Sequence, residues 1–419
     1  MLHMVTCHIP WHCFMNPPHD TPLRRDAHVM ALVGLAHGSS HFAHLLLAPL
    51  FPVFMREFGL SFADVGLLTS VFFLVSGVGQ TLSGFWVDRV GALRVLLLAY
   101  GCFVSACVTA ALAQGFGMLM LAAILAGVGN APFHPCDFSI LNHRIHPKRL
   151  SYAFSVHGLS GNLGWAMAPV FLVGVSALSD WRTAYWVAGC MYGGMAWLLW
   201  LQREVLSTPR VSSPAHTTPT IEVLRQPVVW WCFSFFFLNT MTLAVIQSFG
   251  VSIMDALFGA SLQAATLTLS AYMVMGALGM LVGGVAAAWA AHRHMASDRL
   301  VAMSMTAGAL LLLLCSTGWL DGLSLLVLAL TGFALGVAGP SRDLMIRHAT
   351  PKGATGRVYG LVYAGLDAGF AVSPMLFGWL MDHGQYRLTL VGAAIVLLAS
   401  VWVALGVGRL TNASRFTAG

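Results

Sequence analysis

Apolar residues fill long runs of this chain, and short polar or charged stretches separate one run from the next. A helix that crosses a membrane needs about 20 predominantly apolar residues. Runs near this length predict twelve helices, over residues 29–54, 62–87, 93–114, 116–137, 152–177, 183–201, 227–253, 262–290, 300–319, 323–346, 358–381 and 388–408. The pattern therefore predicts an all-α membrane protein with twelve transmembrane helices.

One long polar stretch, residues 202–226, separates six of these helices from the other six. It contains three prolines among serines and threonines, which is typical of a linker. The predicted organisation is a disordered cytoplasmic leader (1–27), an N-terminal six-helix half (28–201), a cytoplasmic linker (202–226), a C-terminal six-helix half (227–408) and a cytoplasmic tail (409–419).

The two predicted halves share an internal repeat. The first half has Asp137, Tyr152, Gly158, Gly164 and Pro169 in order, and the second half has Asp343, Tyr359, Gly365, Gly369 and Pro374. In both halves the first Gly follows the Tyr by six residues, and the Pro follows the second Gly by five residues. The repeat predicts a duplicated six-helix unit with a substrate site between the halves.

Composition and charge agree with a place in the bilayer. Hydrophobic residues are 58% of the chain and charged residues 9%, whereas soluble domains have roughly 45–50% and 25%. Lys and Arg concentrate on the cytoplasmic side of membrane proteins. With both termini in the cytoplasm, 17 of the 21 basic residues fall in cytoplasmic segments and three in outer turns. This split predicts cytoplasmic termini, and such dispersed charge offers no patch for nucleic acid.

The segment between the second and third predicted helices has a distinctive spacing. Gly84 is followed after three residues by Asp88 and Arg89, and after one more by Gly91. This spacing resembles the loop signature of the major facilitator superfamily, although Leu93 stands where that family usually has a basic residue. The resemblance implies two pseudo-symmetric halves that alternate access, with Asp88 and Arg89 latching the cytoplasmic side in the outward-open state. The alternative is a plain topological role for these charges.

Several short motifs follow one another along the first half: His37 fifteen residues before Pro52, Glu57 to Ser61, Val65-Gly66, Phe133-His134-Pro135 and Gly161 to Gly164. Together they resemble the fosmidomycin-resistance branch of that superfamily, a group of bacterial drug exporters. That branch commonly has Asn-Asp where this chain has Ser40 and His41. The resemblance implies proton-coupled efflux of a small organic compound across the bacterial inner membrane. The alternatives are proton-coupled uptake, or a receptor or scaffold that keeps the fold without transporting.

Asp367 is the deepest carboxylate that the pattern predicts. Its helix starts near Arg357, so ten residues at 1.5 Å per residue place it roughly 15 Å deep in a 30 Å core. An ionisable group at this depth is costly and suggests a functional site. Asp367 is therefore a candidate proton carrier. The alternative is a neutral Asp that ties its helix to a neighbour.

The first predicted helix carries His37, His41 and His44, which lie on one helical face because they are four and three residues apart. We expect this face to line the central cavity, where imidazoles can titrate near neutral pH or contact substrate. For any single one, a hydrogen bond between helices is the alternative. His134 lies between two prolines that interrupt the helical hydrogen bonds, so we expect it at a kink facing the same cavity.

We expect no metal site at these histidines. Residues 37–44 include no carboxylate or thiol, so further ligands would have to come from other helices. Asp137 and Asp343 fall near the cytoplasmic ends of their helices, where a terminal cap or an ion pair is the expected role. His157 and Asn162 could extend the polar lining of the cavity.

The fifth predicted helix contains Gly158, Gly161, Gly164 and Pro169. Small residues at such spacing are typical of close helix packing in membranes. We therefore assign these four residues to helix packing.

The chain lacks the sequence motifs His-Glu-x-x-His, Gly-x-Ser-x-Gly and Gly-Lys-Ser/Thr. We therefore expect neither an enzyme nor a cofactor. The expected partners are a small-molecule substrate, protons and the lipid bilayer, and the expected unit is a monomer.

Overall fold

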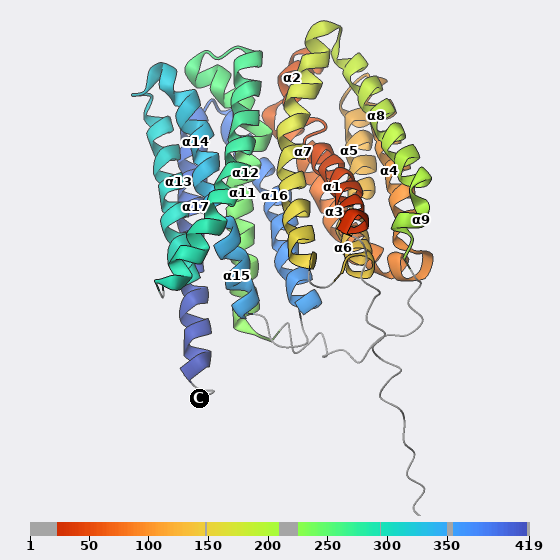
Figure 1. Ribbon diagram of the computed structural model, residues 1–419. Coiled ribbons are helices and arrows are strands. Elements are labelled where there is room, and N and C mark those ends of the chain that lie inside the picture. The colour runs from red at the N-terminus through yellow and green to blue at the C-terminus, as the bar shows by residue number, and fades with distance from the viewer. Residues whose placement is uncertain (1–22, 147–148, 209–224, 294, 350–354, 417–419) are drawn as a thin grey trace, which may run out of the picture.

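The computed structural model describes residues 23–146, 149–208, 225–293, 295–349 and 355–416. Every regular element in these ranges is a helix. Figure 1 shows two groups of roughly parallel helices side by side.

The first group contains α1 (Leu23–His44), η2 (Ala48–Leu50), α2 (Phe51–Phe58), α3 (Phe62–Val90), α4 (Ala92–Ala111), α5 (Phe116–Asn130), α6 (Phe133–Arg144), α7 (Leu150–Leu178), α8 (Trp181–Leu201) and α9 (Arg203–Leu206). The second contains α11 (Pro227–Phe258), α12 (Leu262–His292), α13 (Ser297–Thr317), η4 (Asp321–Leu323), α14 (Ser324–Val337), α15 (Gly339–Ala349), α16 (Thr355–Asp382) and α17 (Tyr386–Phe416).

Eleven segments of the described chain are long and apolar enough to cross a membrane. They coincide with eleven of the twelve predicted spans. The remaining predicted span, 183–201, is the sixth in chain order and corresponds to α8. This helix has 21 residues, and its Trp, Tyr and Gly residues lower its mean hydropathy. The predicted all-α membrane fold is confirmed.

Three spans that the pattern presents as continuous are broken helices. The first span breaks after His44, before Pro49 and Pro52, and continues as η2 and α2. The fourth breaks at Pro132 between α5 and α6, and the tenth breaks before Pro340 between α14 and α15. Proline cannot donate the backbone hydrogen bond that a continuous helix requires. The fourth and tenth spans therefore break at equivalent points of the repeat.

Helix contacts repeat between the two groups. In the first group α1 packs on α7, α3 on α5 and α4 on α8. In the second group the corresponding pairs are α11 with α16, α12 with α14 and α13 with α17. The groups meet where α3 contacts α16 and where α7 contacts α12. These matching pairs are what a duplicated six-helix unit requires.

The charged segment after the second span is mostly helical. We expected Asp88 just beyond the helix, but α3 continues to Val90 and the turn is Gly91 alone, with φ of 94°. The residues from Gly84 to Arg89 are all helical. The helix ends at Gly91 because a positive φ is accessible to glycine at little cost. The expected position of Asp88 is therefore wrong: it lies in the final turns of α3. The side chain of Asp88 lies outside the described residues, and Arg89 is exposed.

Both ends of the helical region extend past the predicted boundaries. The first helix begins at Leu23, five residues before the predicted start of the first half, and α17 continues to Phe416. Asp26 explains the early start, since its buried carboxylate accepts a hydrogen bond from Arg149 Nε at 2.6 Å. The start of the linker forms α9, and the guanidinium of Arg144 donates hydrogen bonds to Ser207.

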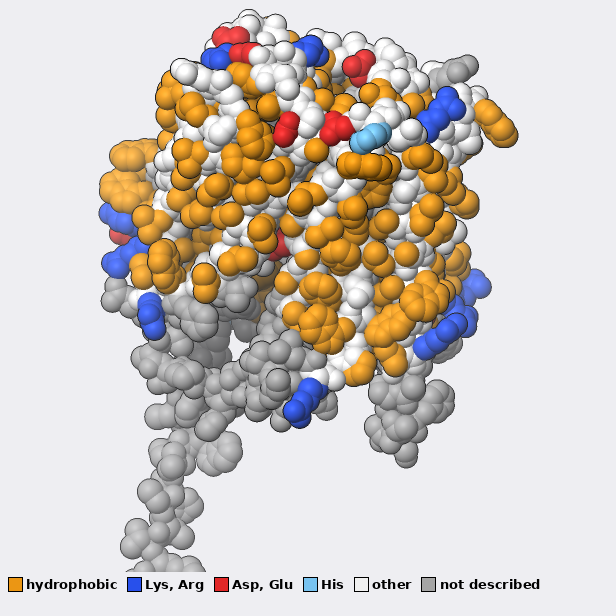
Figure 2. Space-filling view, turned by 180° about the vertical axis from the view of Figure 1, so that it is seen from behind, with side chains coloured by type: hydrophobic (Ala, Val, Ile, Leu, Met, Phe, Trp, Pro, Cys, Tyr) orange, Lys and Arg blue, Asp and Glu red, His pale blue; other side chains and the backbone are white. Residues whose placement is uncertain are grey.

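Large apolar side chains remain exposed around the bundle. Figure 2 shows hydrophobic side chains across the middle of one face, with charged side chains near its two ends. Leu281, Leu310 and Trp379 are more than half exposed. A soluble protein rarely exposes so much apolar surface, whereas lipid covers it in a membrane protein.

Candidate functional site

Five imidazoles gather inside the first group of helices, and we call them with Asp137 the histidine cluster. They come from α1 (His37, His41, His44), α6 (His134) and α7 (His157). The rings of His37 and His157 stack with centroids 3.4 Å apart, and His41 lies 4.4 Å from His37 and 4.6 Å from His44. The structure thus brings together the four predicted histidines and His157, which the sequence had suggested as an extension of the polar lining.

Asp137 lies at the centre of this cluster. Its side chain is fully buried, and Oδ2 is 3.1 Å from both His37 Nδ1 and His157 Nε2. We expected a terminal cap or an ion pair: Asp137 is no terminal cap, and its partners are two buried imidazoles, which form ion pairs with it when they are protonated. Because the break at Pro132 starts a new helix, Asp137 lies one turn into α6 and points at α1 and α7.

The remaining histidines also have partners within the first group. His44 accepts a hydrogen bond at Nδ1 from the indole of Trp165 at 3.2 Å, so its Nε2 carries the proton and donates to Asn130 Oδ1 at 3.2 Å. His134 Nδ1 lies 2.8 Å from Gln80 Oε1. His37 and His44 are buried, whereas His41 and His134 are only partly so. The expected cavity-facing stripe is therefore divided between buried and partly exposed rings.

Asp367 lies at the contact between the two groups. It faces Gly77 of α3 so closely that a β-carbon on Gly77 would lie 3.0 Å from the Asp367 Cβ. One turn along α16, Phe370 stacks on Phe73 at 4.1 Å. In the other direction, Tyr363 lies 6.3 Å from the ring of His134. The α16 face that carries Asp367 therefore packs on the group that holds the histidine cluster.

A second carboxylate joins the groups at one end of the bundle. Asp382, the last residue of α16, accepts hydrogen bonds from the backbone amides of Phe62 at 2.6 Å and Ala63 at 2.9 Å. It thus caps the N-terminus of α3, where free amides and the helix dipole favour an anion. This end lies opposite the C-terminal end of α17 (Figure 1). Sequence reasoning missed Asp382, although an acidic residue at a helix end was visible.

The packing residues of α7 are not equivalent. Gly164 crosses α1 so closely that a β-carbon would collide with the Gly38 carbonyl oxygen, and a β-carbon on Gly161 would lie 2.7 Å from the ring of His41. By contrast, a β-carbon on Gly158 would meet nothing within 4 Å. Pro169 is buried within α7. The packing role expected for Gly158 is therefore wrong.

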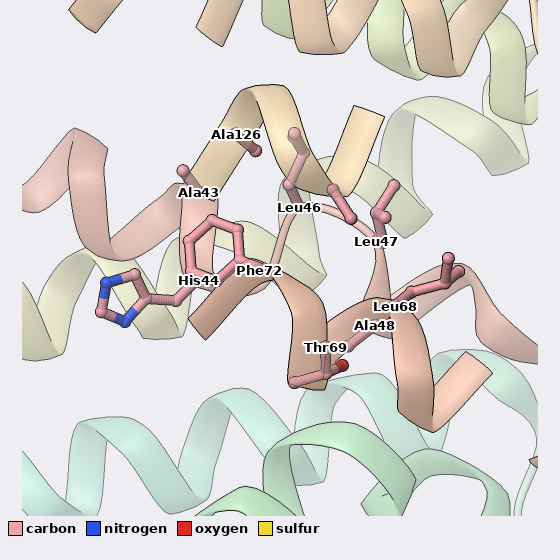
Figure 3. A pocket seen from close by; sticks show the side chains of 10 residues that line it. Ala43, His44, Leu46, Leu47, Ala48, Leu68, Thr69, Phe72 and Ala126 are labelled. Carbon is pink, nitrogen blue, oxygen red and sulfur yellow. The ribbon is translucent and has the colours of Figure 1, made fainter. Parts of the chain in front are cut away.

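A small, mostly apolar pocket lies inside the first group. Figure 3 shows its lining, which comes from the end of α1, the following turn, η2, α3 and α5. His44 and Thr69 are the polar side chains among the lining residues. Asp367 does not line it, so this pocket is separate from the contact between the groups.

Two matching helix groups, an apolar belt and ionisable side chains at their contact define a multi-pass membrane transporter of small molecules. The chain belongs to the major facilitator superfamily, whose family model matches residues 33–320 and 253–417. The predicted resemblance to the superfamily is confirmed.

Individual relatives agree with this assignment. The chain is 24% identical to the fosmidomycin resistance protein of Escherichia coli (strain K12), covering 88% of this chain and 90% of that protein. It is 23% identical to the membrane sensor protein UhpC of the same organism, covering 87% and 92%. A bacterial homologue of the human lysosomal transporter Spinster, solved inward-facing and unoccupied, shares the fold with a TM-score of 0.75. It is 17% identical and covers 93% of this chain and 98% of its own.

Proposed function

We propose that this chain exports a small organic compound in exchange for protons. The two halves, with boundaries near residues 28–201 and 227–408, rock about a substrate site between them. The observation that carries the proposal is the position of Asp367, partly buried at the contact of α16 with α3. A carboxyl there can take up a proton from one side of the membrane and release it to the other as the halves move.

One relative supports the proposed direction of transport. Export is supported by the similarity to a protein named for resistance to an antibiotic. The membrane is proposed to be the bacterial inner membrane, with both termini cytoplasmic, because this placement puts 17 of 21 basic residues inside. The proposed functional unit is a single chain.

A second candidate function comes from the similarity to a membrane sensor protein. A sensor with this fold would bind a small molecule without moving it or protons across the membrane. Both functions therefore require binding of a small molecule, but only the exporter moves that molecule and protons across the membrane.

Transport in inside-out vesicles tests the proposal. A panel of small organic compounds is added, and substrate accumulation is recorded together with proton movement. Wild-type protein should accumulate one class of compound while protons leave the vesicle. Binding without accumulation of any compound would overturn export and favour the sensor.

Two variants then locate the proton carrier. Asp367→Asn keeps the shape of the side chain but cannot exchange a proton, so it should abolish gradient-driven accumulation and retain substrate binding. His41→Gln should retain coupling. The matched control is Asp255→Asn, because Asp255 is an exposed carboxylate near the end of α11. Full coupling in Asp367→Asn together with loss in His41→Gln would contradict this assignment and place the carrier on α1.

A further inference from the structure

Three donor atoms from three helices converge inside the histidine cluster. They are Nδ1 or Nε2 of His37 and His157 and a carboxylate oxygen of Asp137, and all lie within 4.8 Å of one another. All three side chains are buried. Each helix approaches from a different direction: α1, α6 and α7 pack on one another around the cluster.

The spacing of these atoms suits a metal ion. In a tetrahedral site with bonds of about 2.0–2.2 Å, neighbouring ligand atoms lie roughly 3.3–3.5 Å apart. Here Asp137 Oδ2 is 3.1 Å from His37 Nδ1 and 3.1 Å from His157 Nε2. These two distances are a few tenths of an ångström shorter than the separations in such a site.

Hydrogen bonds alone leave part of the cluster unsatisfied. Asp137 Oδ1 and His41 Nδ1 are buried and have no hydrogen-bond partner. A buried polar atom without a partner destabilises the folded state. A cation beside Asp137 would neutralise the carboxylate and engage its lone pairs. The unsatisfied carboxylate oxygen of Asp137 fits a positively charged ligand.

We propose that His37, Asp137 and His157 bind a divalent first-row transition-metal ion of the zinc class. Two imidazoles and one carboxylate are preferred ligands of Zn²⁺, Co²⁺ and Ni²⁺, whereas Mg²⁺ and Ca²⁺ prefer oxygen atoms. The site lies within one half of the transporter. It does not depend on export, on proton coupling or on Asp367.

A second set of ligands gives the ion a route to this site. His37, His41 and His134 also lie within coordinating reach of one another. This set shares His37 with the first, and its other two members are partly exposed. An ion held by the partly exposed rings would therefore share the ligand His37 with the buried site.

Metal binding to purified full-length protein without a histidine tag tests the proposal. The protein is stripped with chelator, equilibrated with Zn²⁺, Co²⁺ or Mg²⁺, and analysed by mass spectrometry of bound metal and by calorimetry. We expect about one Zn²⁺ or Co²⁺ per chain and no Mg²⁺. No transition-metal binding by folded wild-type protein would overturn the proposal.

Variants assign the ion to its ligands. Asp137→Asn and His157→Gln should each weaken binding by at least roughly tenfold, since even outer partners of metal ligands matter by that much. The exposed histidines His143 and His383 supply the matched control, His143→Gln with His383→Gln. Unchanged affinity in folded Asp137→Asn would contradict the assignment.

The leader needs its own control, because Cys7, His8, His12 and Cys13 are further possible ligands. A variant with Ser at both cysteines and Gln at both histidines should keep the ion. Loss of the ion in this variant would overturn the proposal.

Spectroscopy of wild-type protein covers the case in which ligand variants do not fold. X-ray absorption at the zinc edge should show two imidazole nitrogens and at least one oxygen in the first coordination sphere. Sulfur ligands would place the ion elsewhere and contradict the proposal.

Discussion

Gly164 and Gly158 lie on the same helix, but their surroundings differ in ways that only atomic positions reveal. Gly164 touches the backbone of α1 at Gly38, whereas Gly158 has open space where a β-carbon would go. Small residues at membrane helix crossings allow backbones to approach, so the first position tolerates no side chain. The second is free to accept one.

This contrast gives a paired prediction. Gly164→Ala should lower the thermal midpoint in detergent, at a cost of about 1–3 kcal/mol, because α1 and α7 must separate. Gly158→Ala should be neutral or stabilising by up to about 1 kcal/mol, because Ala favours a helix over Gly. Equal midpoints for the two variants would show that the α1–α7 crossing is looser than the structure indicates.

The role assigned to Asp137 depends on neighbours that are distant in the sequence. Along the sequence it stands among apolar residues near a helix end. In the structure one of its oxygens contacts two imidazoles, and the nearer in sequence, His157, is 20 residues away. The proposed metal site depends on this meeting, and so does the test with Asp137→Asn.

At the scale of elements, α3 carries a possible gate at each end. Its N-terminus is capped by Asp382 from the other half. Its C-terminal turns hold Asp88 and Arg89, for which the resemblance to the family signature implies a latch. Because α3 packs against α16, we expect changes at either end of α3 to act on the contact between the halves.

Asp382→Ala should open the end of the bundle that it now closes. Loss of a capping side chain costs about 1 kcal/mol, which is roughly a fivefold change in the ratio of two conformations. Reaction of a cysteine placed at Ala63 with a hydrophilic thiol reagent should therefore become faster. Asp255→Ala is the matched control, and equal rates in both variants would exclude a gating role for Asp382.

At the scale of the whole molecule, the two gates should oppose each other. Asp88→Asn is expected to favour the inward-open state, because the cytoplasmic latch loses its charge. Asp382→Ala is expected to favour the outward-open state, because the opposite end loses its cap. Cysteine accessibility measured from each side of the membrane should shift in opposite directions.

Combining the two changes provides the control. A protein with Asp88→Asn and Asp382→Ala should have accessibility between those of the single variants, because effects on one two-state equilibrium add as free energies. Shifts of both single variants in the same direction would contradict alternating gates at the ends of α3.

The sequence by itself determined the membrane helices and their pairing into two halves. Lipid offers no hydrogen-bond partners, so each span must satisfy its backbone internally, and a long apolar run becomes a helix whatever its neighbours are. The two prolines beside His134 predicted an interruption near Pro132, because the proline ring removes a backbone donor locally. The break before Pro340 was not predicted. The family signature and the spacing of the repeat could be recognised from the sequence without three-dimensional information.

Only the tertiary structure decided what the polar side chains do. His37 and Asp137 are 100 residues apart in sequence and 3.1 Å apart in space, and Asp382 caps a helix that begins 320 residues earlier. No local pattern specifies such contacts, since they follow from how three or more helices cross. For the same reason, the three histidines on the face of α1 predicted no metal site from the sequence. The proposed site became visible only in the structure, where Asp137 of α6 and His157 of α7 lie beside His37.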